Sequence, residues 1–171
     1  YSIMKLQHKS LVFFFSLLIS TFSFSQKKVA SPAETVSGKI NGATITIKYG
    51  SPSVKGRAIW GALVPYDKVW RAGANDATTF ETDKTITIEG KQLPAGKYSF
   101  FVIPNENESI IIFNKEAKQW GSYDYKASSD QLRVTVKNEN GDALVEKLEY
   151  KIMETRIELL WEKLIIGFEV K

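Results

Sequence analysis

The chain has 171 residues, and its 23 Lys and Arg against 19 Asp and Glu leave a formal net charge of +4 at pH 7. It contains no cysteine and one histidine, His8. Thiolate and imidazole are the usual ligands of zinc, copper and haem iron and the usual partners of catalytic serine and cysteine, so the residues after His8 cannot form such sites. We expect no metal and no cofactor, and any catalysis must use carboxylates, Arg, Lys, Tyr, Ser or Thr.

Residues 1–25 are typical of an export signal, with a basic start from Lys5 to Lys9 and an apolar run from Leu11 to Phe24. The run is shorter than the roughly 20 apolar residues of a membrane-spanning helix. We therefore expect cleavage, no stable membrane span and a periplasmic or secreted protein, without the cysteine of a lipoprotein anchor. Residues 1–3 precede the first methionine, Met4, and are given no structural role.

We expect residues 26–35 to be a flexible linker and residues 36–171 to form one domain. A chain of this length can build one hydrophobic core without disulfides or metals. Its Lys and Arg residues do not gather into the basic stripe that is typical of nucleic-acid binding. Nucleic acid is therefore not expected as a partner, whereas a small molecule, a glycan or an envelope protein is.

The first strands of the domain are predicted by alternation. Ala43 to Tyr49 alternates apolar and polar residues with period two, which indicates a half-buried strand. Asn41-Gly42 stands between this run and Val36 to Ile40, and Asn-Gly is the strongest short hairpin signal. We expect the domain to open with a hairpin.

The middle of the chain continues with short strands at Thr78 to Thr82 and Thr85 to Ile88. Lys97 to Ile103 carries apolar side chains at both odd and even positions. It is therefore predicted to be a central strand covered on both faces, with Ile110 to Phe113 as its antiparallel neighbour.

The last part of the chain repeats the two-residue period. The strands expected there are Leu132 to Lys137, Leu148 to Ile152, Ile157 to Trp161 and Leu164 to Val170, with turns at Asn138 to Asp142 and at Glu162-Lys163. Many short strands separated by turn signals are typical of antiparallel sandwiches and barrels. The predicted fold is therefore an all-β, single-domain antiparallel β-sandwich, with a partly open β-barrel as the alternative.

The segment from Tyr49 to Asn75 has no regular period, although it is rich in Gly, Pro, Trp and Arg. A segment of this length inside a compact domain is usually a functional loop, and its aromatic residues argue against disorder. We therefore expect one long ordered loop that carries a site.

Two groups of residues in and near this loop suit ligand binding. Arg71 offers a planar fork of donors for carboxylates, phosphates or hydroxyls, and Trp70 offers a flat face for stacking. The segment from Trp120 to Tyr125 contains three aromatic residues that could form a platform. The candidate ligand-binding residues are Trp60, Trp70, Arg71, Asn75, Trp120, Tyr123 and Tyr125.

Each group also has a purely structural alternative. Trp70 could close the open end of the sandwich, while Arg71 bonds loop carbonyls or pairs with Asp67 or Asp76. The segment from Trp120 to Tyr125 could be a minor core under a long loop. The two groups would frame one pocket if they lay side by side.

Carboxylates supply an enzymatic alternative. A glycosidase needs two carboxyl groups about 5–10 Å apart across a cleft, and Asp76 and Asp124 are the candidate pair, with Arg71 as an electrostatic stabiliser. Most carboxylates in loops are simply solvated. Whether the chain is an enzyme therefore stays open, although the residues favour a protein that is not one.

Four stretches of the chain resemble the DUF2911 family of exported bacterial proteins of unknown function. They are YGSPSVKGRAIWG (Tyr49 to Gly61), LVPYDKVWRAGANDATTF (Leu63 to Phe80), LPAGKYSFFVIP (Leu93 to Pro104) and FNKEAKQWGSYDY (Phe113 to Tyr125). The resemblance spans about Val36 to Val170. It implies an exported, single-domain protein and supplies no catalytic residue.

These observations favour a soluble exported β-domain that acts as a binding or interaction module for a saccharide, a peptide or an envelope component. The alternative is a histidine-free, carboxylate-dependent hydrolase or lyase that acts on envelope or extracellular glycans. A structural or assembly protein is the second alternative.

Overall fold

The computed structural model describes residues 30–171, and the expected export signal lies outside the described residues. The described part forms nine strands and one short 3₁₀ helix. They are β1 (Ala33–Ile40), β2 (Ala43–Gly50), β3 (Thr78–Thr82), β4 (Ile86–Ile88), β5 (Lys91–Leu93), β6 (Gly96–Pro104), β7 (Glu108–Asn114), η1 (Ala127–Ser129), β8 (Asp130–Ile152) and β9 (Arg156–Glu169). Within these residues, no helix has the length and apolar character needed to cross a membrane.

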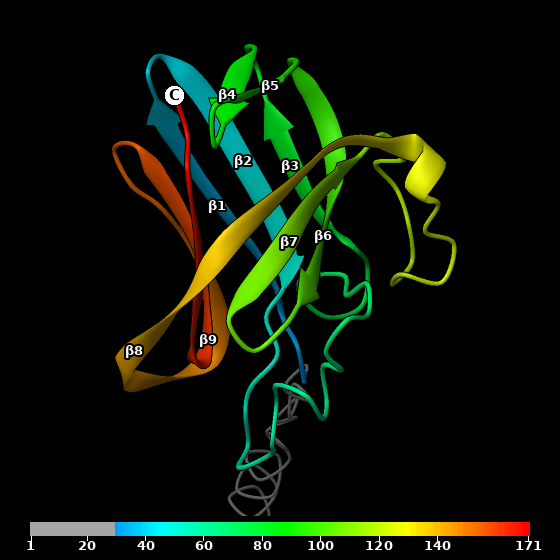
Figure 1. Ribbon diagram of the computed structural model, residues 1–171, viewed down its shortest axis with the longest axis vertical. Coiled ribbons are helices and arrows are strands. Elements are labelled where there is room, and N and C mark those ends of the chain that lie inside the picture. Colours follow the sequence, from blue (N-terminus) through cyan, green and yellow to red (C-terminus); the bar gives the residue numbers. More distant parts are fainter. Residues whose placement is uncertain (1–29) are drawn as a thin grey trace, which may run out of the picture.

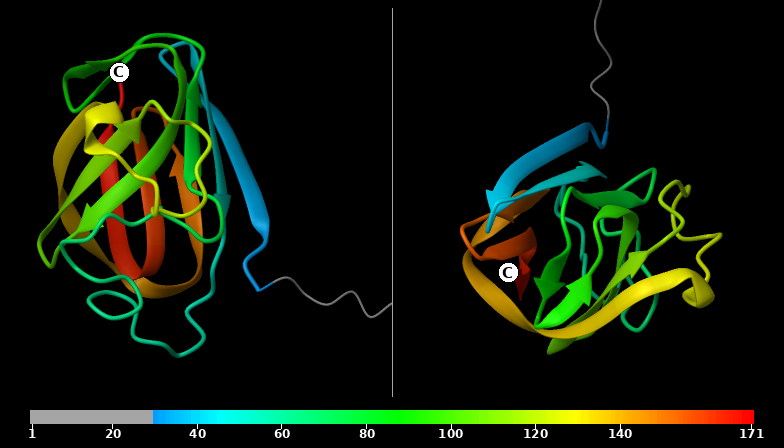
Figure 2. Two further views of the ribbon diagram at one scale, coloured as in Figure 1. Left: turned by 90° about the vertical axis from the view of Figure 1, so that its right-hand side faces the viewer. Right: turned by 90° about the horizontal axis from the view of Figure 1, so that it is seen from above.

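Seven of the strands form one antiparallel sheet in the order β1-β2-β3-β6-β7-β8-β9, while β4 and β5 pair separately. The large sheet curls into a half-barrel (Figure 1, Figure 2). Its curl brings β8 back towards the first strands, where the Leu148 amide donates to the Pro52 carbonyl at 2.9 Å. The predicted antiparallel all-β fold is confirmed, and one curled sheet supplies both of the layers that face each other across the core.

The N-terminal hairpin has the predicted turn. Ile40 pairs with Ala43, and Asn41 and Gly42 both adopt positive φ, as a two-residue hairpin turn requires. However, β1 begins at Ala33, so residues 33–35 belong to the strand and not to the expected linker. The ladder with β2 uses backbone groups, and it therefore extends through residues whose side chains give no apolar signal.

The strand β9 doubles back on itself, as the left view of Figure 2 shows. The Val170 amide donates to the Thr155 carbonyl at 2.8 Å, so the two ends of the strand lie together. Glu162, near the middle, has φ 58°. The closing hairpin expected around Glu162-Lys163 is therefore present within one continuous element.

The strand β8 flanks both halves of this hairpin. Residues 138–140 pair with 164–166, whereas residues 149–152 pair with 157–160, and the register shifts between the two regions. The reversal of β8 thus lies between Asn140 and Glu149, and the first three residues of the turn expected from Asn138 to Asp142 are paired with β9.

The core lies inside the curled sheet. Phe80, Phe100, Phe113 and Phe168 pack there with ring centroids 5.0 to 6.4 Å apart. The strand β6 is buried on both faces, as predicted, because Phe101 points outward into a second, small cluster with Ala77 and Ile112.

One buried hydrogen-bond group ties the long loop to this core. The hydroxyl of Tyr150 donates to the Ala72 carbonyl at 2.7 Å, and the Thr78 hydroxyl donates to the same oxygen at 2.9 Å. Ala72 is fully buried and has φ 53°. Two donors therefore hold the end of the loop in a conformation that non-glycine residues seldom adopt.

The Tyr150→Phe substitution tests this anchor. Because Ala72 keeps the bond from Thr78, we expect the free energy of unfolding at neutral pH to fall by only about 0.5–1.5 kcal/mol. Burial raises the pKa of Tyr150 well above its ordinary value. The wild-type protein should therefore keep its full stability below about pH 10, where unfolded tyrosine ionises, and lose it as pH rises towards the higher folded pKa.

Urea unfolding at neutral and alkaline pH measures both effects. The alkaline loss should be smaller in Tyr150→Phe and unchanged in the control Tyr123→Phe, because Tyr123 is 81% exposed. An alkaline loss equal to that of the wild type would contradict the assignment.

Candidate functional site

The end of the long loop lies directly on the end of β2. The Ala74 amide donates to the Gly50 carbonyl at 3.1 Å. A Cβ atom on Gly50 would lie 2.2 Å from the Ala74 carbonyl oxygen, which is far inside van der Waals contact. Only glycine at position 50 therefore lets the loop approach the sheet this closely.

The loop also meets the segment that follows β7. Asp76 and Trp120 pair as an antiparallel bridge. The bridge is flanked by hydrogen bonds from the Ala77 amide to the Gln119 carbonyl at 3.0 Å and from the Gly121 amide to the Asn75 carbonyl at 3.2 Å. The two regions that the sequence singled out for ligand binding are thus joined through their backbones.

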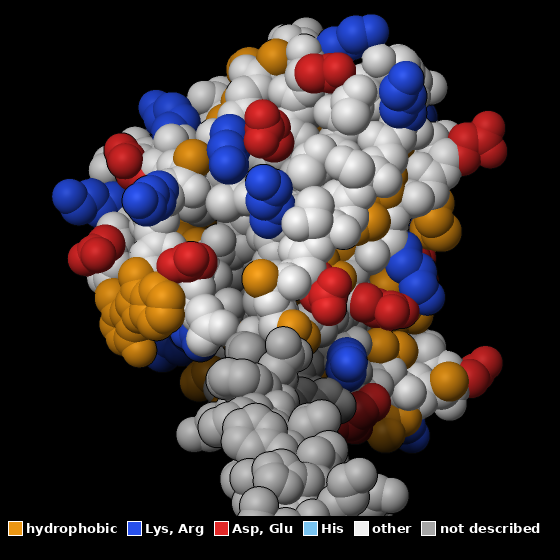
Figure 3. Space-filling view, turned by 180° about the vertical axis from the view of Figure 1, so that it is seen from behind, with side chains coloured by type: hydrophobic (Ala, Val, Ile, Leu, Met, Phe, Trp, Pro, Cys, Tyr) orange, Lys and Arg blue, Asp and Glu red, His pale blue; other side chains and the backbone are white. Residues whose placement is uncertain are grey.

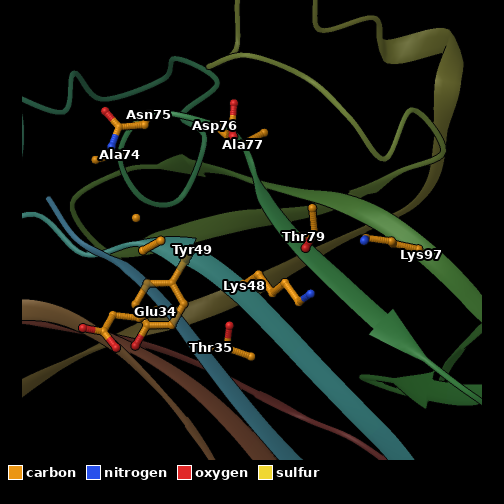
Figure 4. A pocket seen from close by; sticks show the side chains of 12 residues that line it. Glu34, Thr35, Lys48, Tyr49, Ala74, Asn75, Asp76, Ala77, Thr79 and Lys97 are labelled. Carbon is orange, nitrogen blue, oxygen red and sulfur yellow. The ribbon is translucent and has the colours of Figure 1, made fainter.

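This junction borders a groove on the outer face of the sheet, which we call the outer groove and which is lined by apolar, polar and charged residues. It consists of two hollows, with volumes of about 360 and 300 Å³, that share the side chains of Asp76, Ala77, Thr79 and Lys97. Figure 4 shows the larger hollow, with the loop end above strands β1, β2 and β3. The other residues that line the groove are Ala33, Glu34, Thr35, Lys48, Tyr49, Gly50, Ala74, Asn75, Ala117, Lys118 and Gln119.

The floor of the outer groove follows from strand alternation. Lys48 pairs with Thr79 on the outer face, next to the inward pair Ile47 and Phe80. Lys97 enters from β6 on the same outer face and forms an ion pair with Glu81 at 3.9 Å. Both partners are about half exposed, so this pair contributes little to stability.

The outer face of these strands carries both signs of charge (Figure 3). In the groove itself, Lys48, Lys97 and Lys118 stand against the carboxylates of Glu34 and Asp76. The balance is therefore slightly positive, and most of these side chains remain available to a ligand.

Trp120 carries a prominent exposed apolar side chain on the segment that is bridged to Asp76 of the outer groove. Its side chain is 61% exposed although its backbone is paired with Asp76. Tyr123 is still more exposed. Exposed aromatic rings offer rigid surfaces that suit contact with a ligand or a partner.

Gln119 presents an unpaired acceptor at the smaller hollow. It is only 8% exposed, and its amide nitrogen donates to Asn114 Oδ1 at 3.1 Å and to the Glu116 carbonyl at 2.8 Å. Its Oε1 atom is buried and has no hydrogen-bond partner within the described residues.

Trp60 and Trp70 lie outside this groove, in a cluster with Trp161. The rings of Trp70 and Trp161 stack at 6.0 Å, and Trp60 meets Trp70 edge-on at 5.6 Å. Trp161 is almost fully buried, whereas the other two are partly buried. Trp70 thus closes one end of the core, which agrees with the structural alternative; Trp60 also lines a separate hollow of about 360 Å³ with Arg57 and Tyr66.

Tyr125 packs on the outer side of β6. Its ring meets that of Phe101 at 5.1 Å, and its hydroxyl donates to Asp130 Oδ2 at 2.6 Å and accepts from Arg133. Burial, followed by the bond to Asp130, raises the pKa of Tyr125. This arrangement matches the minor core that was the alternative for Trp120 to Tyr125.

The two candidate catalytic carboxylates are not brought together in the groove. Asp76 lines it, whereas Asp124 is exposed and is not part of the lining. Residues 30–171 also contain no group of three or more His, Cys, Asp or Glu that could hold a metal ion.

Arg71 is half-buried beneath the segment that carries Trp120. A Cβ atom on Gly121 would lie 3.7 Å from Arg71 Nη1. The expected partners are engaged elsewhere or solvated, since Asp67 accepts a bond from Asn105 at 2.7 Å and Asp76 is exposed. In the described part of the chain, Arg71 takes part in none of the ion pairs and its buried Nε has no partner.

Of the residues that line the outer groove, the sequence singled out Asn75 and Asp76 and missed the others, among them Lys48, Thr79, Lys97 and Gln119. The alternation of their strands places Lys48, Thr79 and Lys97 on an outer face, which the sequence does indicate. These residues lie close together because of the order of the strands in the sheet. No residue pattern within a single strand indicates that order.

Comparison with known proteins finds one family. A family model described as "Protein of unknown function (DUF2911)" matches residues 31–170. No curated protein and no solved structure matches the chain.

The Gly50→Ala substitution tests whether the loop end is seated on β2. The added methyl would collide with the Ala74 backbone, so we expect the free energy of unfolding to fall by about 1–3 kcal/mol and proteolysis of the loop to accelerate. Gly141→Ala is the control, because its nearest neighbour would be the end of the Ile165 side chain at 3.4 Å. Equal thermal unfolding of the two variants would contradict the close contact.

Proposed function

We propose that this chain, which belongs to the DUF2911 family, is an exported binding module that holds a saccharide in the outer groove. One observation carries the proposal: the backbone bridge between Asp76 and Trp120 joins the segment with an exposed indole ring to a groove that is lined by both apolar and polar residues. The apolar run of residues 1–25 supports export to the periplasm or beyond, and the absence of cysteine argues against a lipid anchor.

Sugar rings suit such a surface because they combine apolar C–H faces with a rim of hydroxyl groups. An indole ring offers a rigid surface for one face and loses little side-chain entropy on binding. The hydroxyl rim requires donors and acceptors in fixed places, which Asn75, Asp76, Thr79 and Lys97 supply. The two hollows share four lining residues, and their volumes of about 360 and 300 Å³ favour a chain of sugars over a single small molecule.

The other functions have less support. The carboxylate pair expected for a hydrolase or lyase, Asp76 and Asp124, is not assembled, because Asp124 does not line the groove and the other carboxylate there is that of Glu34. A peptide, an envelope protein or an assembly partner could also cover Trp120 and Tyr123, but the outer groove would then have no assigned use.

The Trp120→Ala substitution tests the proposal. Removing the exposed ring should weaken binding at least about tenfold, equivalent to about 1.4 kcal/mol, with little change in thermal stability. Isothermal titration calorimetry should use galactose, mannose, glucose and N-acetylglucosamine tetrasaccharides and the corresponding uronic acids.

Two controls accompany this measurement. Trp70→Ala should instead lower the melting temperature, because Trp70 packs on Trp161. Leu144→Ala, at another exposed apolar side chain, should change neither property. If the wild type bound no oligosaccharide of the set, or if Trp120→Ala bound as well as the wild type, the proposed function would be wrong. A stable partner protein recovered at Trp120 in its place would favour the assembly role.

A further inference from the structure

Arg71 carries a charge for which the described residues provide no counter-ion. Its Nε atom is buried without a hydrogen-bond partner, and no carboxylate lies within ion-pair distance of its guanidinium group. A buried N–H donor without an acceptor is costly, since it loses hydration and gains no bond in return. Such a side chain is a candidate to bind an anionic group of a ligand.

The surroundings of Arg71 place it next to the proposed binding surface. Gly121 has φ 63°, and a Cβ atom there would lie 3.0 Å from the Tyr123 ring as well as 3.7 Å from Arg71 Nη1. The Tyr123 ring and the guanidinium group therefore lie on the same side of Gly121. The two exposed aromatic residues, Trp120 and Tyr123, lie one residue before and two residues after Gly121 in the chain.

The backbone links Arg71 to the outer groove over a short distance. Gly121 donates to the carbonyl of Asn75, which lines the groove, and the Arg71 carbonyl accepts from the Thr78 amide at 3.2 Å. Arg71 itself lines neither hollow, so a ligand reaches it only by extending from the groove over the segment from Trp120 to Tyr123.

We propose that Arg71 binds an oxyanion on the saccharide, so that the ligand of this protein is an acidic glycan. A guanidinium group matches a carboxylate or a sulfate ester with two parallel hydrogen bonds, which a neutral hydroxymethyl group cannot form. Lys97 and Lys118 add positive charge in the smaller hollow, against Asp76. This inference rests on the proposed function and gives its ligand a chemical class.

The test compares matched sugars that differ only in charge. Tetrasaccharides of galactose and galacturonate, mannose and mannuronate, and glucose and glucuronate are titrated into the full-length mature protein by calorimetry. In each pair that binds, the acidic member should bind about tenfold tighter or more, and the difference should shrink as NaCl is raised. A sulfated galactose tetrasaccharide in a separate arm distinguishes a sulfate ester from a carboxylate.

The Arg71→Gln variant should bind neutral and acidic members almost equally, while its affinity for the neutral member stays near that of the wild type. Arg71→Lys, which keeps the charge without the fork, should retain part of the preference. Arg57→Gln is the matched control, because Arg57 lies in the same loop and already donates to the Val54 and Ser53 carbonyls. Melting temperatures establish that each variant is folded.

The outcomes separate the two proposals. Equal binding of neutral and acidic sugars by the wild type, or an acidic preference that survives in Arg71→Gln, overturns the role of Arg71 and leaves saccharide binding intact. If Arg71→Gln does not fold, the salt dependence in the wild type and the Arg71→Lys preference decide the same question. Absence of binding to every sugar overturns both proposals.

Discussion

The carbonyl oxygen of Ala72 is the point on which the loop, the core and the outer groove depend. Tyr150 reaches it from β8 across the core, and Thr78 reaches it from the start of β3. These two bonds hold Ala72 in the left-handed region, which costs a non-glycine residue about 1–2 kcal/mol. From that position the chain can seat Ala74 on Gly50 and pair Asp76 with Trp120. The groove is thus held in shape by a tyrosine that does not line it.

The neighbours Trp70 and Arg71 show how a sequence motif divides between two environments. Trp70 exchanges backbone hydrogen bonds with Val102 of β6, at 2.8 and 2.9 Å, so this part of the loop is extended like a strand. Successive side chains of an extended chain point to opposite faces. Trp70 therefore stacks on Trp161 in the core, whereas Arg71 lies towards Gly121 on the outside. Trp70 therefore contributes to core packing, whereas Arg71 Nε has no hydrogen-bond partner among residues 30–171.

The aromatic residues of the second motif divide in the same way. Tyr125 covers Phe101 and bonds to Asp130, while Trp120 remains exposed beside the groove. Burial of Tyr125 secures the segment on the sheet, and the backbone bridge to Asp76 secures its other end. A rigid segment can present an exposed ring without losing much entropy when a ligand arrives. The buried Tyr125 therefore holds in place the segment on which Trp120 is exposed.

The sequence by itself determined the features that depend on near neighbours in the chain. The Asn41-Gly42 hairpin, the two buried faces of β6 and the reversal at Glu162 follow from period and turn chemistry, and all are present. The tertiary structure alone decided which Trp is buried and which is exposed, since Trp161 and Trp120 differ in what covers them. It also decided that Lys48, Thr79 and Lys97 share one groove, because β2, β3 and β6 become neighbours only when the sheet forms. The period of apolar residues within one strand shows which face of the sheet each side chain is on. It does not show which distant strand will be its neighbour, so the sequence assigns a side chain to a face but not to a site.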